Sequence, residues 1–338
     1  TLSANGARTK IGGGTTFTTA HLSGINSGLG FAPGQTLSGT ILFEGTNPGG
    51  RNVEMNGTAG AFTVGATGVI QTATGLTANS QIGGSLYYGG AMALTNNGLI
   101  SSQTNGITLT IQPASFTNAG VLEAANGGTL AVPAGYTQTA GTTRLNNGTL
   151  TASLSNIAQT VTISGGRLEG NGTVNANVSN AGTIAPGLLG AGHLTINGNV
   201  TLGSTSNIDI DIGGVTQGTQ YDLLTQVGTV ALTLQGTLTL HLANGFAPSG
   251  GQMFSILDSN QTLLGAFSNV VNGARLTTAD GLGSFQVNYG PSSAFDPTDV
   301  VLNNFIAVPE PSTIASLALG GFVIFALRRK AICRRSRV

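Results

Sequence analysis

Residues that could carry out catalysis or hold a metal ion are few in this chain of 338 residues, of which only 7% are charged. The one close carboxylate pair is Asp209 and Asp211, at alternate positions in a segment of alternating Ile and Asp. Alternate residues of a strand face the same side, and two such carboxylates could bind calcium or serve the acid–base chemistry of a glycosidase. The commoner role of such a pair is to solvate the exposed face of a half-buried strand, and we adopt that interpretation.

Histidine, cysteine and glycine-rich segments give no sign of a metal or cofactor site. His21, His193 and His241 are far apart in the sequence, and the single cysteine is Cys333. Zinc sites usually bring such ligands from closely spaced pairs. Residues 12–14 are three glycines, but no Walker lysine follows them. We therefore predict no metal, no cofactor and no enzymatic activity.

The aromatic pair Tyr87 and Tyr88 is the clearest candidate for stacking on a sugar ring, because glycines flank it and could leave it exposed. Packing in the core or at a corner of the fold is the commoner use of such residues. We therefore treat the pair as a possible carbohydrate contact and not as a predicted site.

The elements that position these residues are predicted to be short strands. Glycine occupies 54 positions and hydrophobic residues make up 40% of the chain, a composition that disfavours long helices and excludes a disordered polar chain. Between residues 60 and 240, runs of alternating polar and aliphatic residues are interrupted by Gly or Asn-Gly, which indicates strands separated by tight turns. One phrase recurs at 94–100, 116–122 and 178–184, and weaker echoes occur at 127–130, 147–150, 166–168, 171–174 and 197–200.

A repeated unit of about twenty residues is too small to bury a core, so such units must stack. Asn96 and Asn118 are 22 residues apart, and recurring asparagines of this kind could form an amide ladder along the stacking axis. We predict an all-β fold, a right-handed parallel β-helix. The alternative is a β-sandwich, which also contains many short strands but does not repeat one phrase at a regular interval.

The sequence pattern changes after residue 200, where longer segments of alternating polar and aliphatic residues begin. We divide the chain into a parallel β-helix at 1–200, a β-rich cap at 201–305 and a C-terminal tail at 306–338. The block from 184 to 199 and the strands after it resemble the passenger stems of autotransporter-like surface proteins. That resemblance implies a β-helix that ends in a cap, but no membrane barrel follows, which makes self-transport an unlikely route of export.

The C-terminal tail is predicted to be a membrane anchor. Residues 312–327 are uncharged and, as a helix, would span about 24 Å, slightly less than the hydrocarbon core of a bilayer. The preceding chain carries six cations and twelve anions, a net charge of −6. This charge asymmetry predicts a transmembrane helix with its basic end in the cytoplasm, and a buried core helix is the less favoured alternative. The basic cluster comprises Arg328, Arg329, Lys330, Arg334 and Arg335.

A short motif stands immediately before this segment: Val308, Pro309, Glu310 and Pro311. Pro-Glu-Pro, an apolar stretch and an Arg-rich end, in that order, resemble the PEP-CTERM sorting signal of exopolysaccharide-producing Gram-negative bacteria. The resemblance implies export, transient anchoring in the inner membrane and processing by an exosortase. The two prolines hold the segment extended, which suits a processing site and equally suits a stiff linker before an anchor.

Taken together, the sequence predicts a non-enzymatic exported protein of the cell surface or extracellular matrix, structural or adhesive and associated with exopolysaccharide. Its expected partners are an exosortase-type enzyme, the membrane and polysaccharide, with self-association through a terminal coil as a further possibility. A nucleic-acid partner is not expected, because the body lacks a basic face. Two alternatives remain: a β-helix carbohydrate-active enzyme (a polysaccharide lyase or glycoside hydrolase), and a membrane-anchored protein whose tail is never cut.

Overall fold

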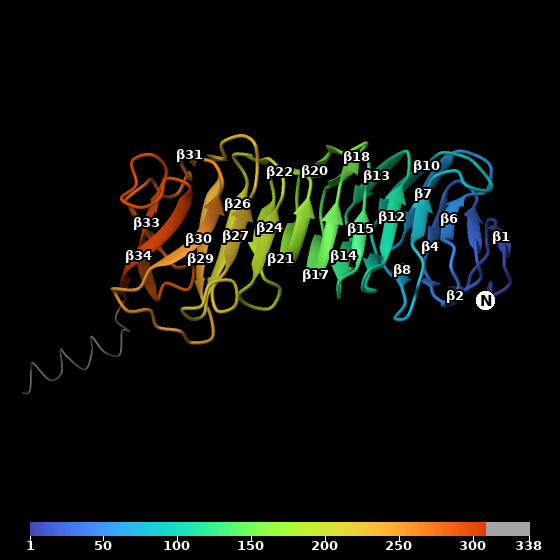
Figure 1. The fold of residues 1–338 in the computed structure, drawn as a ribbon, viewed down its shortest axis with the longest axis horizontal. Helices are drawn as coiled ribbons and strands as arrows, with labels where there is room; N and C mark the ends of the chain where they lie inside the picture. Colours follow the sequence, from blue (N-terminus) through green and yellow to red (C-terminus); the bar gives the residue numbers. More distant parts are fainter. Residues whose placement is uncertain (309–338) are drawn as a thin grey trace, which may run out of the picture.

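The computed structural model describes residues 1–308, and all the regular structure within this range is β-strand. The chain passes repeatedly through three columns of strands that stack along one long axis, so that residues run in sequence order from one end of the molecule to the other (Figure 1). Nearly all strand pairs are parallel, which is compatible with the predicted β-helix and not with an antiparallel sandwich. No helix that could span a bilayer occurs within the described residues; the predicted transmembrane helix at 312–327 lies outside them.

The first and second columns belong to one 22-stranded sheet, because β17 and β21 bend from one column into the other. The first column contains β2 (Thr19–Leu22), β5 (Thr40–Phe43), β8 (Val69–Thr72), β11 (Leu99–Ser102), β14 (Val121–Ala125), the first halves of β17 (Thr142–Thr151) and β21 (Arg167–Asn175), β23 (Thr183–Pro186), β26 (Asn207–Ile212) and β29 (Thr237–Leu242). The second column contains β1 (Arg8–Ile11), β3 (Gly28–Phe31), β6 (Arg51–Met55), β9 (Ser80–Gly83), β12 (Thr108–Gln112), β15 (Thr129–Ala131), the second halves of β17 and β21, β24 (His193–Ile196), β27 (Leu223–Gln226) and β30 (Phe254–Ser259).

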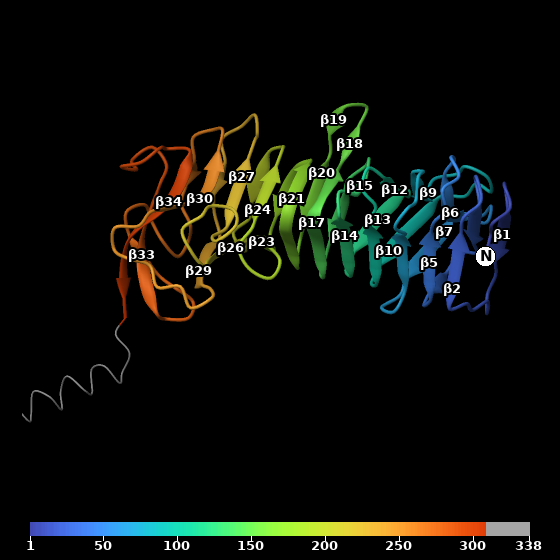
Figure 2. The ribbon, with the colours of Figure 1, turned by 60° about the horizontal axis from the view of Figure 1, so that its bottom comes forward.

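The third column is a separate eight-stranded sheet. It contains β4 (Gln35–Leu37), β7 (Gly60–Val64), β10 (Met92–Asn96), β13 (Ser115–Asn118), β16 (Tyr136–Gln138), β20 (Thr160–Ile163), β22 (Asn177–Asn180) and β25 (Val200–Leu202). A short hairpin of β18 (Ser153–Leu154) and β19 (Ile157–Ala158) projects from the coil between β17 and β20 (Figure 2).

One continuous hydrophobic core runs inside the three columns. Inward-facing aliphatic residues alternate with outward-facing polar ones, as in β26, where three isoleucines are buried between half-buried Asn and Asp. The C-terminal end is closed by strands of a different kind. There β32 (Arg275–Thr277), β33 (Gly283–Tyr289) and β34 (Asp299–Ala307) pair antiparallel with one another and with β30.

Parallel stacking continues beyond residue 200, through β30 and through the small pair β28 (Thr233–Leu234) and β31 (Leu264–Gly265). The division of the chain at residues 200 and 305 stays a prediction. At the other end β1 pairs with β3 alone, and its outward residues Arg8 and Lys10 are exposed. Charges on an edge strand disfavour pairing with another chain, and self-association through a terminal coil stays a prediction.

The coils are less regular than the predicted unit of about twenty residues. Neighbouring strands of the first column are 16 residues apart where Arg167 faces Thr183, and 30 apart where Asn207 faces Thr237. The excess is taken up by loops at the corners, which leave the strand register intact. The predicted relation between Asn96 and Asn118 is correct, because the two residues are register partners on β10 and β13.

The predicted amide ladder is present in the core. Asn96 Nδ2 donates to Asn118 Oδ1 at 2.7 Å, and Asn118 Nδ2 donates to Gln138 Oε1 at 3.2 Å, all three side chains being fully buried. The ladder ends at the next rung, where Ile163 is the partner of Gln138. Asn180, one rung further, is buried, and within the described residues its side chain bonds only to the carbonyl of Gly182 at its own corner.

Candidate functional site

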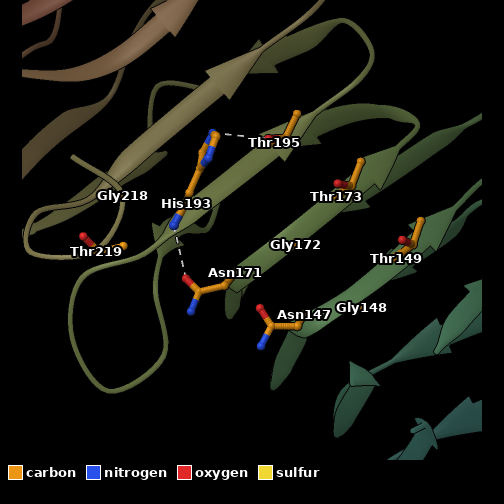
Figure 3. Close-up of a pocket in the computed structure, with 10 residues that line it drawn as sticks. All are labelled: Asn147, Gly148, Thr149, Asn171, Gly172, Thr173, His193, Thr195, Gly218 and Thr219. Carbon is orange, nitrogen blue, oxygen red and sulfur yellow. Dashed lines mark hydrogen bonds between the residues drawn. The ribbon is translucent and has the colours of Figure 1, made fainter. Parts of the chain in front are cut away.

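A groove of about 530 Å³ lies on the outer face of the second column (Figure 3). Its lining is polar and contains no carboxylate, lysine or arginine: Asn147, Gly148, Thr149, Asn171, Gly172, Thr173, His193, Thr195, Gly218 and Thr219.

A local irregularity forms the groove. The backbone at Asn147 is left-handed (φ 56°), and the β17–β21 register shifts between Asn146 and Gly148. Asparagine tolerates this conformation better than other non-glycine residues. At Gly148 and Gly172 a Cβ atom would collide with a carbonyl oxygen of the preceding coil, so the floor of the groove is bare backbone.

Hydroxyl groups line the upper side of the groove in register. Thr149, Thr173 and Thr195 are partners on successive strands, and Figure 3 shows them side by side. Neighbouring parallel strands are about 4.8 Å apart, so the hydroxyls recur at that interval. The complete ladder of half-buried threonines on this column is Thr108, Thr129, Thr149, Thr173, Thr195 and Thr225.

His193 lies at one end of the groove. Its backbone N–H donates to Asn171 Oδ1 at 3.1 Å, and its ring Nε2 lies 2.9 Å from Thr225 Oγ1 and 3.3 Å from Thr195 Oγ1. The loop that carries Gly218 contacts the same histidine and closes this end. The imidazole is therefore a hydrogen-bonding member of the hydroxyl ladder, and the lining of the groove contains no carboxylate to pair with it.

The predicted carboxylate pair lies elsewhere, on the outer face of the first column, and it is not simply a solvated strand face. Asp209 Oδ1 lies 2.9 Å from His241 Nε2, and Asp209 Oδ2 lies 3.0 Å from Arg167 Nη1. Arg167 also contacts Glu169 at 3.2 Å, and Glu169 contacts Arg144 at 3.1 Å. Half-buried charges of alternating sign thus run from coil to coil along this face.

A third carboxyl joins the pair from the loop before β27. Asp222 lines the same pocket of about 210 Å³ as Asp209 and Asp211, yet only 1% of its surface is exposed. Its Oδ1 accepts the N–H of Gly192 at 2.7 Å, and its Oδ2 accepts the N–H of Asp211 at 2.8 Å. Nothing in the sequence marked Asp222, because it follows Asp211 by a loop whose path local pattern does not reveal.

Burial raises the pKa of two carboxyls in this pocket, Asp222 and Asp211. It raises the pKa of Asp222 to about 8, against the opposing effect of the two N–H donors. It also raises the pKa of Asp211, which the nearby His241 partly offsets. Within residues 1–308 no group of three or more His, Cys, Asp or Glu is arranged to hold a metal ion.

The tyrosine pair covers the second column near the N-terminus. The guanidinium of Arg8 lies 3.5 Å from the centre of the Tyr87 ring, and the ammonium of Lys10 lies 5.1 Å from that of Tyr88. Tyr88 packs over Gly30, where a side chain would collide with its ring. Tyr88 is therefore used in packing, whereas Tyr87 keeps about a third of its surface exposed.

The predicted sorting motif begins where β34 ends. Val308 is exposed and donates its N–H to the carbonyl of Leu282 at 2.8 Å. The other residues predicted for the motif and the basic cluster lie outside the described part of the chain: Pro309, Glu310, Pro311, Arg328, Arg329, Lys330, Arg334 and Arg335.

Comparison with protein families identifies a PEP-CTERM protein-sorting motif at residues 307–330. This motif is a signal for export and for sorting to the cell envelope, with processing by an exosortase and membrane anchoring. Neither the curated proteins nor the solved structures contain a match to this chain. The sorting motif is therefore the part of the resemblance that the comparisons support, and the likeness to autotransporter stems stays a prediction.

Proposed function

We propose that this chain is a non-enzymatic exported protein, structural or adhesive, located at the cell surface or in the extracellular matrix, and that it associates with exopolysaccharide. In this proposal its body is a right-handed parallel β-helix with a C-terminal cap. The observation that carries the proposal is the groove of Figure 3, where uncharged hydroxyl, amide and backbone groups meet in one open hollow.

A polar groove of this kind suits a sugar polymer. A polysaccharide presents hydroxyl groups at regular intervals, and the threonine ladder repeats hydrogen-bonding groups along the axis of the coil. Each hydrogen bond contributes only about 0.5–1.5 kcal/mol net, so useful affinity requires many of them together. A long open face provides that number without a deep pocket.

Replacing Thr149 and Thr173 together by valine tests the groove. The change removes two hydroxyls from one face and keeps the shape of the side chains, so we expect affinity for a neutral polysaccharide to fall about tenfold, or about 1.4 kcal/mol. Binding is measured by affinity electrophoresis in gels that contain the host's own exopolysaccharide. Thr40→Val, on the outer face of the first column, is the matched control and should leave mobility unchanged. Equal mobility of the double variant and the parent would remove the groove from the proposal.

Processing of the tail is tested by mass spectrometry of the form released by an exosortase-containing host. We expect a C-terminus near Pro311, because the predicted motif would be the processing site and the basic end would stay with the membrane. Glu310→Ala should abolish most of the processed form, while Glu44→Ala, in the body, should not. An intact Val338 on the released parent chain would instead support a protein whose tail is never cut.

A carbohydrate-active enzyme is the second candidate, since one pocket brings Asp209, Asp211 and Asp222 together. Hydrolysis of a glycosidic bond needs two carboxyl groups that can reach the substrate. Both oxygens of Asp222 are occupied by backbone N–H groups, and Asp209 is held between Arg167 and His241. Among these three carboxyls only that of Asp211 has no hydrogen-bond or ion-pair partner in the described residues, which favours the non-enzymatic function. Release of reducing ends or unsaturated products from neutral or acidic polysaccharides above background would favour the enzyme.

A further inference from the structure

Three exposed apolar side chains lie together at the C-terminal end of the described body, where β33 and β34 pair (Figure 1). Leu282 is 52% exposed, Ile306 58% and Val308 54%. Ile306 is the antiparallel partner of Ser284, and the N–H of Val308 donates to the carbonyl of Leu282 at 2.8 Å, which continues the same register. Opposite residues of such a pair lie on one face, as do alternate residues of a strand. The three side chains therefore share one face, and we call them the exit patch.

The opposite face of the same two strands is packed into the core. The rings of Phe285 and Phe305 are buried with their centres 4.8 Å apart, and a Cβ atom at Gly283 would collide with the Phe305 ring. The exit patch is therefore a true outer surface and not a loose part of the core. Single exposed apolar residues are normal on a protein, whereas neighbouring ones mark a surface that contacts a partner or a membrane.

The sequence that follows the exit patch indicates a bilayer as its partner. The sorting motif at 307–330 implies membrane anchoring, and the uncharged stretch begins at residue 312, only three residues after the end of the exit patch. A chain from residue 308 to residue 312 spans at most about 14 Å, and the headgroup layer on each side of a bilayer is about 5–8 Å thick. Anchoring through residues 312–327 therefore places the exit patch in this layer or directly above it.

The groups that border the exit patch suit the same partner. Arg275, on β32, donates through Nε to Ser284 Oγ at 3.0 Å and through Nη2 to the carbonyls of Ser284 and Asn304. Asp280 Oδ1 accepts the N–H of Leu282 at 3.0 Å. One charge of each sign thus borders an apolar surface, an arrangement that matches zwitterionic headgroups better than a strongly charged partner.

We propose that the exit patch inserts into the headgroup layer of the bilayer while the protein is anchored, so that Leu282, Ile306 and Val308 reach the acyl-chain boundary. Three side chains alone bind lipid weakly, but a tether of three residues makes the contact intramolecular and raises its effective concentration. The contact keeps the motif at 309–311 at the membrane surface, and the coils of the body extend from that end. The proposal goes beyond the proposed function, since it depends on membrane anchoring and not on polysaccharide association.

Tryptophan fluorescence of the 338-residue chain in vesicles tests the proposal. The chain contains no tryptophan, so Ile306→Trp places a single probe in the exit patch. The vesicles are phosphatidylcholine whose acyl chains carry bromine, a short-range quencher, close to the headgroups. We expect about twofold quenching relative to unbrominated vesicles and emission at shorter wavelength, because an interfacial apolar face lies about 5–10 Å deep. Ile157→Trp, at a 66% exposed position of the β18–β19 hairpin, is the matched control and should emit as in water.

Flotation of the same vesicles separates failure of the anchor from failure of the exit patch. A chain that does not float with the vesicles would overturn the anchoring and this proposal with it. A floating chain whose Ile306→Trp probe emits as in water would overturn the exit patch alone, even if shielding appeared once an exosortase was added, since that result would assign the patch to a protein. Equal quenching of the Ile157→Trp control would mean that the body lies along the bilayer, which also contradicts the proposal.

Removal of the neighbouring apolar groups gives a second measurement. Leu282→Ser and Val308→Ser, added together to the Ile306→Trp chain, should abolish most of the quenching while flotation stays unchanged, and circular dichroism checks that this variant folds. Unchanged quenching would show that the probe follows the anchor passively and would overturn the contribution of the exit patch. No polysaccharide is present in these experiments, so their outcome is independent of the groove.

Discussion

Asn118→Ala should lower the free energy of unfolding by about 3 to 5 kcal/mol, because Asn118 is the central rung of the buried amide ladder. The substitution removes its bonds to Asn96, to Gln138 and to the carbonyl of Gly120. Each buried polar partner that loses a bond costs about 1 to 3 kcal/mol, and networks of this kind can be worth more than the sum of their pairs. The effect is measured as the shift of the urea midpoint by far-UV circular dichroism.

Asn175→Ala is the control for this experiment. The Asn175 side chain accepts a hydrogen bond from the side-chain amide of Asn197 at 2.9 Å. Like the bonds of the ladder, it joins two amides on successive coils, but it lies on the exposed face. Water can replace that bond, so the loss should stay below about 1 kcal/mol. Midpoints of Asn118→Ala and Asn175→Ala that agree within error would show that burial of the ladder contributes nothing. Because stacked coils can unfold in parts, the comparison relies on the midpoints measured with the same probe.

The all-β character and the stacking of strands were predictable from the sequence because both leave a local trace. A strand that faces a core on one side alternates aliphatic and polar residues, and stacked coils repeat the residues that form their corners. The phrase at 94–100 and its copy at 116–122 lie directly over one another, since Asn96 and Asn118 are register partners. The amide ladder follows from this repetition, and its hydrogen bonds confirm the hypothesis.

The length of each coil could not be predicted in the same way. Corners absorb loops of different sizes without changing the register of the strands, so repeat spacing in the sequence drifts while the stacking does not. The rung between Gln138 and Asn180 belongs to Ile163, which no asparagine-based pattern could reveal. A ladder inferred from one recurring residue type therefore overestimates how far the ladder extends.

The clusters of charged residues could not be predicted from the sequence for a related reason. Arg167, Asp209 and His241 come from three different coils. The strands of Asp209 and His241 are neighbours in the first column, and the long side chain of Arg167 reaches Asp209 across the intervening strand β23. Asn52 faces outward from its strand, yet it is buried because a loop of the next coil covers it. A side chain that faces outward from its strand is normally exposed to solvent. Asn52 is buried only because of the path of that loop, which the sequence pattern does not reveal. The groove is an intermediate case. The repeated Asn-Gly-Thr triplets at 147–149 and 171–173 could be recognised in the sequence, but the sequence did not show that both line one groove.

The stability of the protein should fall as the pH rises from 5 to 8, and Asp222→Asn should remove most of that slope. Burial raises the pKa of Asp222 to about 8, from 3.8 for the ordinary carboxyl. Below about pH 4 the group is protonated in the folded and the unfolded chain alike. Between these two values the folded chain keeps a proton that the unfolded chain has lost, so the free energy of unfolding decreases by about 1.4 kcal/mol per pH unit.

From pH 5 to pH 8 the contribution of Asp222 amounts to about 4 kcal/mol, and it is obtained by comparing urea unfolding of the two chains at several pH values. The variant loses an acceptor for the N–H of Gly192 or Asp211, so it should be less stable at pH 5; only the difference in slope reports the proton. Asp211, whose pKa burial also raises, is present in both chains, so the difference in slope reports Asp222 together with its charge interaction with Asp211. Parallel curves for parent and variant would mean that the two backbone donors hold Asp222 as a carboxylate throughout. In that case the pocket would contain a fixed negative charge, and cation binding would become the better interpretation of the three carboxyls.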